Sequence, residues 1–276
     1  MSTTLECLLA DAVAQLEEAG IADAAVDAAY LMEYVLHVNR MDYFLDKEKE
    51  VAEEDAKRYR EQIQVRASHV PLQYITGEQE FMGYSFLVNS HVLIPRQDTE
   101  ILVEEVAKLA DGKQVLDVCT GSGCILLSLE QLCSLEKAVG VDLSPDALAV
   151  AMENGKRLSS KAVWVQSDLF SKVEGKFDII VSNPPYIESE VIKELDEEVR
   201  VHEPMMALDG GADGLVFYRK IIDAAPDYLN SQGYLCFEIG YNQGEAVKDL
   251  MEHAGFLECQ VKKDLAGLNR VVMGHL

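Results

Sequence analysis

Basic residues are scarce in this chain of 276 residues: 24 lysines and arginines stand against 48 aspartates and glutamates, a formal net charge of −24. The deficit is spread evenly, since residues 1–100 alone carry a net charge of −11. Proteins that bind duplex nucleic acid usually present a basic face to the phosphates. The densest basic cluster, Lys57, Arg58 and Arg60, has the spacing of a solvated helix face. We therefore expect no direct nucleic-acid binding.

Long apolar runs, targeting signals and metal-binding spacings are also missing. No apolar stretch approaches the roughly 20 residues that a membrane-spanning helix needs. The first basic residue is Arg40, so no charged segment precedes an apolar one near residue 1. The cysteines lack the C-x-x-C spacing typical of zinc or redox centres. We expect a soluble cytoplasmic protein with reduced cysteines, no bound metal and no membrane association. The cysteines are Cys7, Cys119, Cys124, Cys133, Cys236 and Cys259.

Residues 1–70 have the pattern of a small helical domain. Thr3 and Glu6 have the spacing of a helix-capping box, and the apolar residues behind them recur at helical spacing. The predicted helices cover about 2–20, 23–37 and 50–68. Three residues of the second helix are expected to face inward: Val26, Tyr30 and Val35.

Past residue 70 the pattern changes twice. The segment from Glu80 to Ile94 is aromatic and β-branched with Gly83 inside it, which predicts a β-hairpin in a linker over 71–97. Over 98–276, short apolar strands alternate with helices, an order typical of a doubly wound, mostly parallel α/β sheet. The predicted strands cover 115–119, 138–142, 163–166, 178–182 and 234–239, with two more possible at 258–262 and 270–273; the helices cover 101–109, 124–133, 145–155 and 244–253.

A glycine-containing turn joins the first of these strands to the first helix after it. Gly121 and Gly123 allow the backbone to approach a ligand closely, and the start of the helix offers free N–H groups. The third glycine of a dinucleotide fingerprint would fall on Leu126, so a cradle for a pyrophosphate is not indicated.

Asp142, at the end of the next strand, is placed to accept both hydroxyls of a ribose. An adenosine ligand without a phosphate to cradle suggests S-adenosylmethionine, whose cationic sulfonium is compatible with an acid such as Asp117 near the loop. Asp168 lies where an adenine amino group could be met. Taken alone, these residues fit equally well an ordinary strand–turn–helix corner, with Asp142 capping the helix that begins at Pro145.

Asn183-Pro184-Pro185-Tyr186 follows the fourth strand and is the most specific segment of the chain. The prolines have no N–H and fix φ, so the neighbouring carbonyls are held rigidly. The Asn183 side-chain oxygen and the Pro184 carbonyl can each accept one hydrogen from a planar NH₂ group, and Tyr186 offers a flat face to an amide or a base.

Such an arrangement suits a weak nitrogen nucleophile whose lone pair is delocalised. Two acceptors orient the nitrogen and stabilise the positive charge that develops during methyl transfer, and no strong general base is required. The alternative is a rigid turn that ends a strand, but the glycine loop and Asp142 upstream favour methyl transfer. Other catalytic signatures (G-x-S-x-G, G-x-x-x-x-G-K-[ST], H-E-x-x-H) are absent, and the six histidines are scattered.

Over nearly its whole length the sequence resembles the protein-(glutamine-N5) methyltransferases that modify peptide chain release factors. The Asn-Pro-Pro-Tyr motif does not select this family, because adenine-N6, cytosine-N4 and some RNA guanine methyltransferases share it. The segments that do resemble the family are Pro71–Gly77, Leu93–Glu100, Glu198–Leu215, Phe237–Gly240 and Gln243-Gly244.

The resemblance implies a class I, Rossmann-like methyltransferase fold with a seven-stranded, mostly parallel sheet and an N-terminal helical domain that helps to bind the substrate protein. It implies methylation of the glutamine N5 atom in the Gly-Gly-Gln motif of class-1 release factors, with S-adenosyl-L-homocysteine as the second product. On this chain, the family's cofactor-binding residues fall on Cys119, Thr120, Gly121, Ser122, Gly123, Asp142, Asp168, Leu169 and Asn183, and its glutamine-binding residues on Asn183, Pro184, Pro185 and Tyr186.

Three positions depart from the family pattern. Cys119 stands where the family usually has glycine, which puts a positive φ at this position in question. Gln97 replaces a usual proline, and Leu169 occupies a position where an aromatic residue is frequent.

Three other functions compete with this one. A sister family methylates a glutamine of a ribosomal protein, but its segment after Pro-Arg differs from Gln-Asp-Thr-Glu, residues 97–100 here. A nucleic-acid amino-methyltransferase would need a basic cleft or a target-recognition domain. A non-catalytic adenosine-binding module would not need Asn183 and Tyr186 intact.

Overall fold

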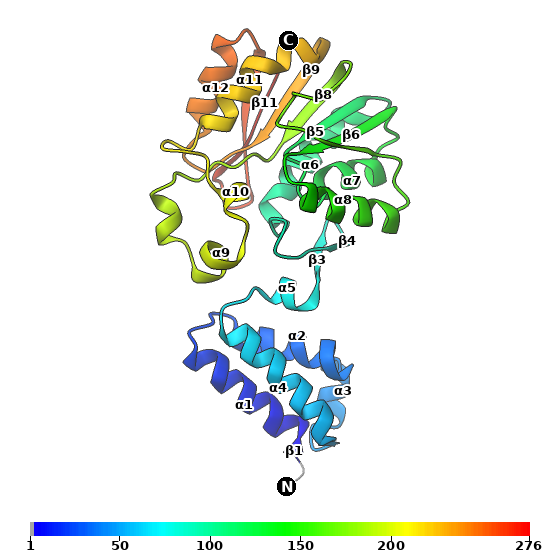
Figure 1. Cartoon of the computed structure of the whole chain (residues 1–276), viewed down its shortest axis with the longest axis vertical. Coiled ribbons are helices and arrows are strands. Elements are labelled where there is room, and N and C mark those ends of the chain that lie inside the picture. Colours follow the sequence, from blue (N-terminus) through cyan, green and yellow to red (C-terminus); the bar gives the residue numbers. More distant parts are fainter. Residues whose placement is uncertain (1–2) are drawn as a thin grey trace. The chain divides into compact units, whose positions relative to one another are not determined.

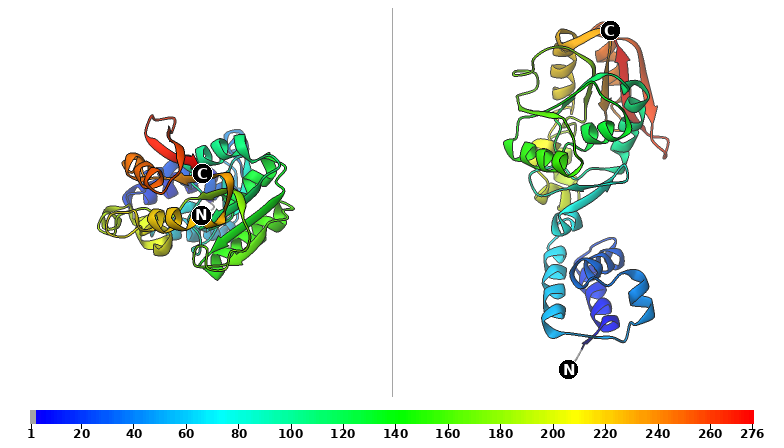
Figure 2. Two further views of the ribbon diagram at one scale, coloured as in Figure 1. Left: turned by 90° about the horizontal axis from the view of Figure 1, so that it is seen from above. Right: turned by 90° about the vertical axis from the view of Figure 1, so that its right-hand side faces the viewer.

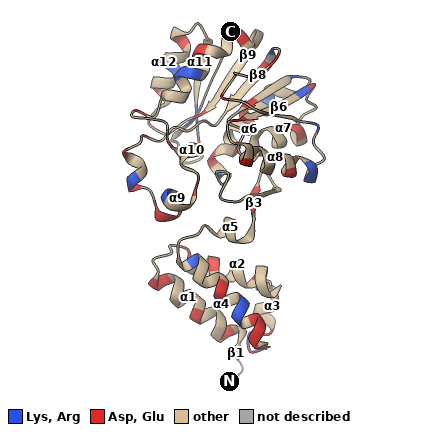
Figure 3. Ribbon diagram, in the orientation of Figure 1, with Lys and Arg blue, Asp and Glu red and all other residues tan. Residues whose placement is uncertain are grey.

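A computed structural model describes residues 3–276, which form two compact units (Figure 1). Unit 1 comprises the described residues up to Gly77 together with Glu197–His202, and unit 2 comprises Glu78–Asp196 and Glu203–Leu276. Each unit has its own apolar core. Acidic residues are distributed over both units (Figure 3). Within residues 3–276, no helix combines the length and the apolar character needed to cross a bilayer.

Unit 1 is helical, as expected, with a core formed by the first, second and fourth helices. Leu8 and Leu16 of α1 pack with Leu31 of α2 and with Tyr59 and Ile63 of α4. The helices are α1 (Leu5–Glu18), α2 (Ala24–Leu36), α3 (Arg40–Leu45), α4 (Glu53–Ala67), α5 (Leu72–Thr76) and α9 (Glu197–His202), and two short antiparallel strands are β1 (Thr3–Thr4) and β2 (Glu50–Val51).

Two details of the predicted helices are wrong. Thr4, rather than Thr3, caps α1 by accepting a hydrogen bond from Cys7 N at 3.3 Å, because Thr3 pairs in β1. Val26 and Tyr30 are 53% and 59% exposed, although Val35 is buried as predicted. The buried face of α2 is Ala24, Asp27, Ala28, Leu31, Met32 and Val35. Half of these buried residues are small or polar, whereas the prediction had assigned the larger side chains of Val26 and Tyr30 to the core.

Unit 2 is built on a seven-stranded sheet in the order β10-β11-β9-β8-β5-β6-β7, which confirms the expected architecture. Strands β7, β6, β5, β8 and β9 run parallel, β11 is antiparallel to β9, and β10 is antiparallel to β11. The hairpin of β10 and β11, red in Figure 2, forms one edge. The strands are β5 (Gln114–Val118), β6 (Lys137–Asp142), β7 (Val163–Gln166), β8 (Phe177–Ser182), β9 (Leu229–Glu238), β10 (Leu257–Lys263) and β11 (Asn269–His275).

Helices cover both faces of this sheet. Ile179 and Val181 of β8 pack in the core with α6 and α7, whereas Ile180 between them packs in the core with α11 and α12. This alternation is what a strand buried on both faces requires. The helices of unit 2 are α6 (Gln97–Ala110), α7 (Cys124–Leu132), α8 (Pro145–Arg157), η1 (Val191–Glu194), α10 (Met205–Leu208), α11 (Val216–Tyr228) and α12 (Gly244–His253).

The predicted hairpin is present, and Asn154 is one of the residues that hold it against the rest of unit 2. It consists of β3 (Glu78–Phe81) and β4 (Tyr84–Leu87). Asn154 of α8 exchanges two hydrogen bonds with Leu87 and donates a third to Ser122 O at 2.9 Å. The hairpin is thereby linked to the glycine-containing loop after β5.

Strand β5 lies at the point where the chain changes direction in the sheet. The path runs from β5 through β6 to β7 on one side and returns to β8 on the other. In open α/β sheets, ligands bind at the carboxyl ends of the strands at such a switch point. Asp142 ends β6, and the loops after β5, β7 and β8 carry the other predicted site residues, so the fold brings them to one edge of the sheet.

Candidate active site

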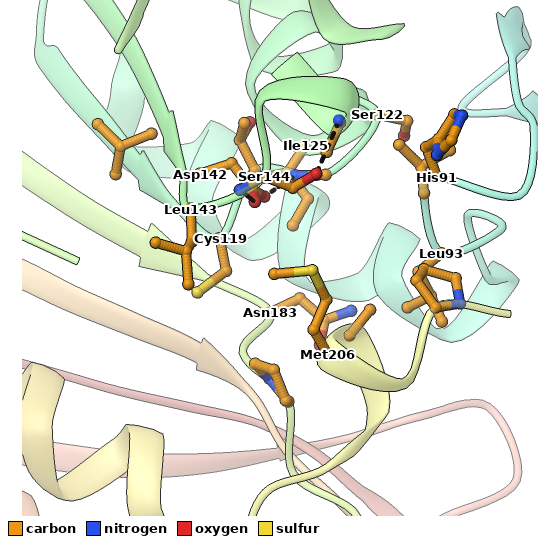
Figure 4. A pocket seen from close by; sticks show the side chains of 18 of the residues that line it. His91, Leu93, Cys119, Ser122, Ile125, Asp142, Leu143, Ser144, Asn183 and Met206 are labelled. Carbon is orange, nitrogen blue, oxygen red and sulfur yellow. Dashed lines mark hydrogen bonds between the residues drawn. The ribbon is translucent and has the colours of Figure 1, made fainter. Parts of the chain in front are cut away.

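A cavity of about 530 Å³ opens at this edge and lies wholly within unit 2 (Figure 4). Its volume is in the usual range for small-molecule sites. Three predicted site residues, Gly123, Pro184 and Tyr186, do not line it. The predicted residues that do line it are Cys119, Thr120, Gly121, Ser122, Asp142, Asp168, Leu169, Asn183 and Pro185.

Asp142 holds the loop after β5 against the end of β6. One carboxylate oxygen accepts a hydrogen bond from Gly121 N at 2.9 Å and the other accepts one from Ser144 N at 2.9 Å. Ser144, not Asp142, caps α8, through Ala147 N at 3.1 Å. Burial raises the pKa of Asp142, and the backbone hydrogen bonds oppose this effect. Each carboxylate oxygen can accept a second hydrogen bond, so the cavity side of Asp142 can still bind hydroxyl groups.

The three departures from the family pattern lie beside the cavity or at the start of α6, and the structure does not explain the leucine at residue 169. Cys119 has φ of 62° and Leu169 has φ of 47°, so both non-glycine residues adopt the left-handed conformation beside the cavity. The positive φ at residue 119 is therefore retained at a cost of about 1–2 kcal/mol. Gln97 is the first residue of α6, a position that favours proline but accepts other residues because its N–H needs no helical partner.

Gly123 contributes to packing beneath the loop. A Cβ atom at Gly123 would lie 2.8 Å from the Trp164 ring, and one at Gly140 would lie 2.5 Å from it. Trp164 on β7 pairs directly with Gly140 on β6. The indole therefore fills the space under the loop that the two glycines leave open.

Asp117 lies buried under the same loop. Thr120 Oγ1 donates a hydrogen bond to one of its carboxylate oxygens at 2.5 Å, and the other oxygen finds no hydrogen-bond partner among residues 3–276. Burial raises the pKa of Asp117 to about 7; Asp142 adds to this effect and the Thr120 bond opposes it. An acidic group with a free oxygen under the loop is compatible with a cationic ligand above it.

The Asn183–Tyr186 segment follows β8. Asn183 lines the cavity and donates from Nδ2 to Thr99 Oγ1 at 3.4 Å. Tyr186 turns the other way: its ring packs against the core with α11 and α12, and its hydroxyl donates to Glu238 Oε1 at 3.1 Å. Burial and the neighbouring Glu238 raise the pKa of Tyr186. The use of its ring as a platform for a substrate amide stays a prediction.

Sequence reasoning did not assign roles to the residues that support this segment. Gln243 Nε2 donates to Tyr186 O at 2.9 Å. A Cβ atom at Gly210 would lie 2.7 Å from Tyr186 Cα, so the glycine-rich chain after α10 packs directly on the motif. The sequence does contain one indication that Glu238 has a special role, because this charged residue directly follows the apolar run Leu235–Phe237 of a buried strand.

An ion pair lies beside the cavity, which Arg96 lines. Glu203 has a buried side chain that pairs with Arg96 and accepts a hydrogen bond from Ile94 N at 3.2 Å. The residues after Glu203 begin α10, and Figure 4 shows Met206 near Asn183 in the cavity. The Arg96–Glu203 ion pair joins two segments that are more than a hundred residues apart in the sequence, so neither segment alone predicts it.

Comparisons with known proteins show the family to which the chain is similar. Two family profiles match: the PrmC N-terminal domain over residues 8–77 and the methyltransferase small domain over residues 96–202. A release factor glutamine methyltransferase from Geobacter sulfurreducens is 41% identical over 263 residues, which cover 95% of this chain and 93% of the relative.

Solved structures share the fold at low identity. A methyltransferase from Pyrococcus furiosus has a TM-score of 0.55 at 16% identity, covering 78% of this chain and 98% of its own. The Thermus thermophilus 16S rRNA N2 G1207 methyltransferase, solved with AdoMet and guanosine, has a TM-score of 0.51 at 18% identity, covering 72% of this chain and 49% of its own.

The sheet order, the loop after β5 and these structural relatives define a class I methyltransferase. Within that class, 41% identity to a release factor glutamine methyltransferase over 95% of this chain identifies the family. The chain belongs to the release factor glutamine methyltransferase family.

Proposed function

We propose that this enzyme transfers the methyl group of S-adenosyl-L-methionine to the side-chain amide nitrogen (N5) of the glutamine in the Gly-Gly-Gln motif of class-1 peptide chain release factors. One observation carries the proposal: the Asn183 amide and the Asp142 carboxylate line the same cavity. A family whose members act on release factors supports the choice of acceptor. S-adenosyl-L-homocysteine is the expected second product.

The cavity suits an adenosine ligand with a positive charge. Asp142 has acceptor capacity left for the ribose hydroxyls, and the exposed Asp168 beside Leu169 is available to the adenine. The unpaired oxygen of Asp117 lies beneath the loop. Residues 119–123 would supply backbone N–H and C=O groups to the rest of the cofactor. When bound, S-adenosylmethionine supplies an electrophilic methyl group.

The chain's own residues would then hold the acceptor nitrogen. Asn183 Oδ1 accepts one hydrogen of the glutamine NH₂ group, and the Pro184 carbonyl accepts the other. Pro185 and Tyr186 keep this part of the backbone rigid. Holding the nitrogen in line lowers the entropic part of the barrier, and the two acceptors stabilise the positive charge that develops on it.

We propose further that the helical domain, residues 1–70, helps to bind the release factor, followed by a linker over 71–97 and a catalytic domain over 98–276. The release factor is the only macromolecular partner in this scheme, with neither nucleic acid nor membrane in contact. The site of action would be the cytoplasm, where release factors work.

The test is substitution of Asn183. Asn183→Ala should lower kcat by about 10²–10³-fold, the usual cost of losing a preorganised partner for developing charge, and should weaken S-adenosylmethionine binding much less. Asn183→Asp keeps an acceptor oxygen and should retain more activity than Asn183→Ala. The assay follows labelled methyl transfer to a purified release factor and locates the methyl group by mass spectrometry. An Ala variant as active as the parent would refute this mechanism.

A further inference from the structure

Helix α10 brings two methionines to the cavity beside the residue proposed to hold the acceptor. Met205 and Met206 are each about half exposed, and both line the cavity. Figure 4 shows the Met206 side chain pointing into the cavity next to Asn183. Apolar surface that is open to the cavity therefore lies beside the proposed acceptor residue.

The start of α10 is held by the buried side chain of Glu203. This carboxylate forms an ion pair with Arg96 and accepts a hydrogen bond from Ile94 N at 3.2 Å. Charge-assisted hydrogen bonds of this kind are stronger than neutral ones and fix the geometry of both partners. The first turn of α10 is therefore held against the segment that precedes α6.

The end of α10 is held by the chain that follows the Asn183–Tyr186 segment. Ile187 N donates to Leu208 O at 3.0 Å, and Gly210 N donates to Ile187 O at 2.8 Å. Leu208, the last residue of the helix, is buried. The helix is thus held at both ends by unit 2, while the methionines of its first turn line the cavity.

A glutamine side chain presents two kinds of surface to such a cavity. Its amide is polar, whereas its methylene groups are apolar and gain free energy by leaving water. Methionine is unbranched and polarisable, so it adapts to an apolar chain beside it. We propose that Met206 is the apolar wall of the acceptor site, which packs on the methylene groups of the glutamine, and that Glu203 is the positioning residue that holds this wall. This inference rests on the proposed function.

Met206→Ala tests the wall. We expect KM for a short Gly-Gly-Gln peptide to rise by about 5–30-fold, the effect of losing part of the burial of one apolar side chain. The value of kcat should change little, because the lost contact is with a part of the glutamine that does not react. Met206→Leu, similar in volume, should stay within about threefold of the parent. The matched control is Met152→Ala, which removes an exposed methionine of α8 that does not line the cavity.

Glu203→Gln tests the positioning role. Glutamine keeps the size of the side chain and an acceptor for Ile94 N but removes the ion pair, and the Arg96 side chain left behind is 41% exposed and so stays hydrated. We expect KM for the peptide to rise by about 3–10-fold, with an unchanged dissociation constant for S-adenosylmethionine by calorimetry. Because the wall is then already displaced, adding Met206→Ala should raise KM by less than about threefold more. Fully additive losses would show that the two residues act separately and would overturn this role.

A third measurement does not depend on methylation. Ala207 N and Asp209 N each donate to a carbonyl at the start of α10, and their hydrogen exchange, followed by NMR, should be faster in Glu203→Gln and unchanged in Met206→Ala. Equal exchange in the parent and Glu203→Gln would refute the positioning role.

The outcomes separate this inference from the proposed function. A parent that methylates the peptide, with the same KM in Met206→Ala, would refute the wall alone. A parent that does not methylate the peptide or an intact release factor would refute the proposed function and the acceptor site with it, whereas the exchange of the α10 amides would still decide whether Glu203 holds the helix.

Discussion

Asp142 combines a structural task with the one proposed for it in binding. Its carboxylate holds Gly121 N and Ser144 N, and it lines the cavity between them. A substitution therefore removes an acceptor for the ribose and frees the loop at the same time. Both effects act on the cofactor, and neither touches the acceptor residue Asn183.

Asp142→Ala should weaken S-adenosylmethionine binding by about 1–3 kcal/mol, as expected when a buried group loses a charged hydrogen-bond partner. Titration calorimetry on the folded variant measures this directly. Asp146→Ala is the control, since it removes the same charge four residues away from a side chain that is 69% exposed. Unchanged affinity in the Asp142 variant would remove this residue from the cofactor site.

Asp117 should make unit 2 less stable as the pH rises. Its pKa is about 7 in the folded protein against an ordinary value of 3.8, so the folded state holds this proton more tightly than the unfolded state does. The stabilisation is complete below pH 3.8 and is lost as the pH rises through about 7. Asparagine at the same position cannot ionise.

Relative to Asp117→Asn, the parent should therefore lose about 2–3 kcal/mol of unfolding free energy between about pH 5 and about pH 8. Urea unfolding at both pH values gives the difference. Asp111→Asn, at an exposed turn, corrects for the change in net charge. A parent–variant difference that is the same at both pH values would show that Asp117 is ionised throughout.

At the scale of elements, periodicity predicts what lies within one segment. The five parallel strands, four helices, the hairpin and the two strands of the tail were all predicted and are present. Helix α11 was not predicted; Pro226 lies inside it, and a proline within a helical pattern usually indicates that the helix has ended. The buried face of α2 was misjudged because small or polar residues form half of it.

The sequence analysis identified the residues of the loops that line the cavity, but not the residues of other elements that hold these loops in place. The loop after β5, Asp142 and Asn183 were found because each follows a predicted strand. The Arg96–Glu203 pair joins residues more than a hundred positions apart, and Tyr186 donates to Glu238 across 52 positions. Such contacts depend on how the strands are ordered in the sheet, which the periodicity of one segment does not contain.

Strand β6 and the loop after β5 pack against Trp164. Gly140→Ala would place a Cβ atom 2.5 Å from the indole and should destabilise unit 2 by about 1–3 kcal/mol, the usual cost of overpacking. Gly155→Ala is a matched control, because its Cβ would lie 3.5 Å from the same ring, at ordinary contact distance in helix α8. That change should be neutral or stabilising by about 0.5–1 kcal/mol.

Urea unfolding followed by tryptophan fluorescence measures both variants, since Trp164 is the single tryptophan of the chain. The Gly140 variant should also shift the native emission, because the ring must move. Equal stability of the two variants would show that the indole has room that the structure does not indicate.

At the scale of the molecule, the two units have separate cores. The core of unit 1 lies entirely before residue 77, and no buried core residue of unit 2 precedes Phe81. One exception crosses this division: Glu197–His202 groups with unit 1, where Glu198 pairs with Arg66 at 2.8 Å. The chain thus returns to the helical unit shortly after the Asn183–Tyr186 segment, which connects a domain proposed for substrate binding with the segment proposed to hold the glutamine.

Because each unit has its own core, we predict that unit 2 binds the cofactor without unit 1, whereas recognition of the release factor needs both units. A chain of residues 78–276 retains both cores of unit 2 and every residue that lines the cavity, so it should fold and bind S-adenosylmethionine with the affinity of the full chain. It should methylate an intact release factor poorly, because the helical unit is gone and Glu197–His202 has lost its partners. Calorimetry tests the first expectation, and kcat/KM on the release factor tests the second.

A short Gly-Gly-Gln peptide serves as the control substrate, since it cannot use an extended docking surface and should be methylated equally by both chains. Full activity of the truncated chain on the intact release factor would show that the helical unit serves another purpose.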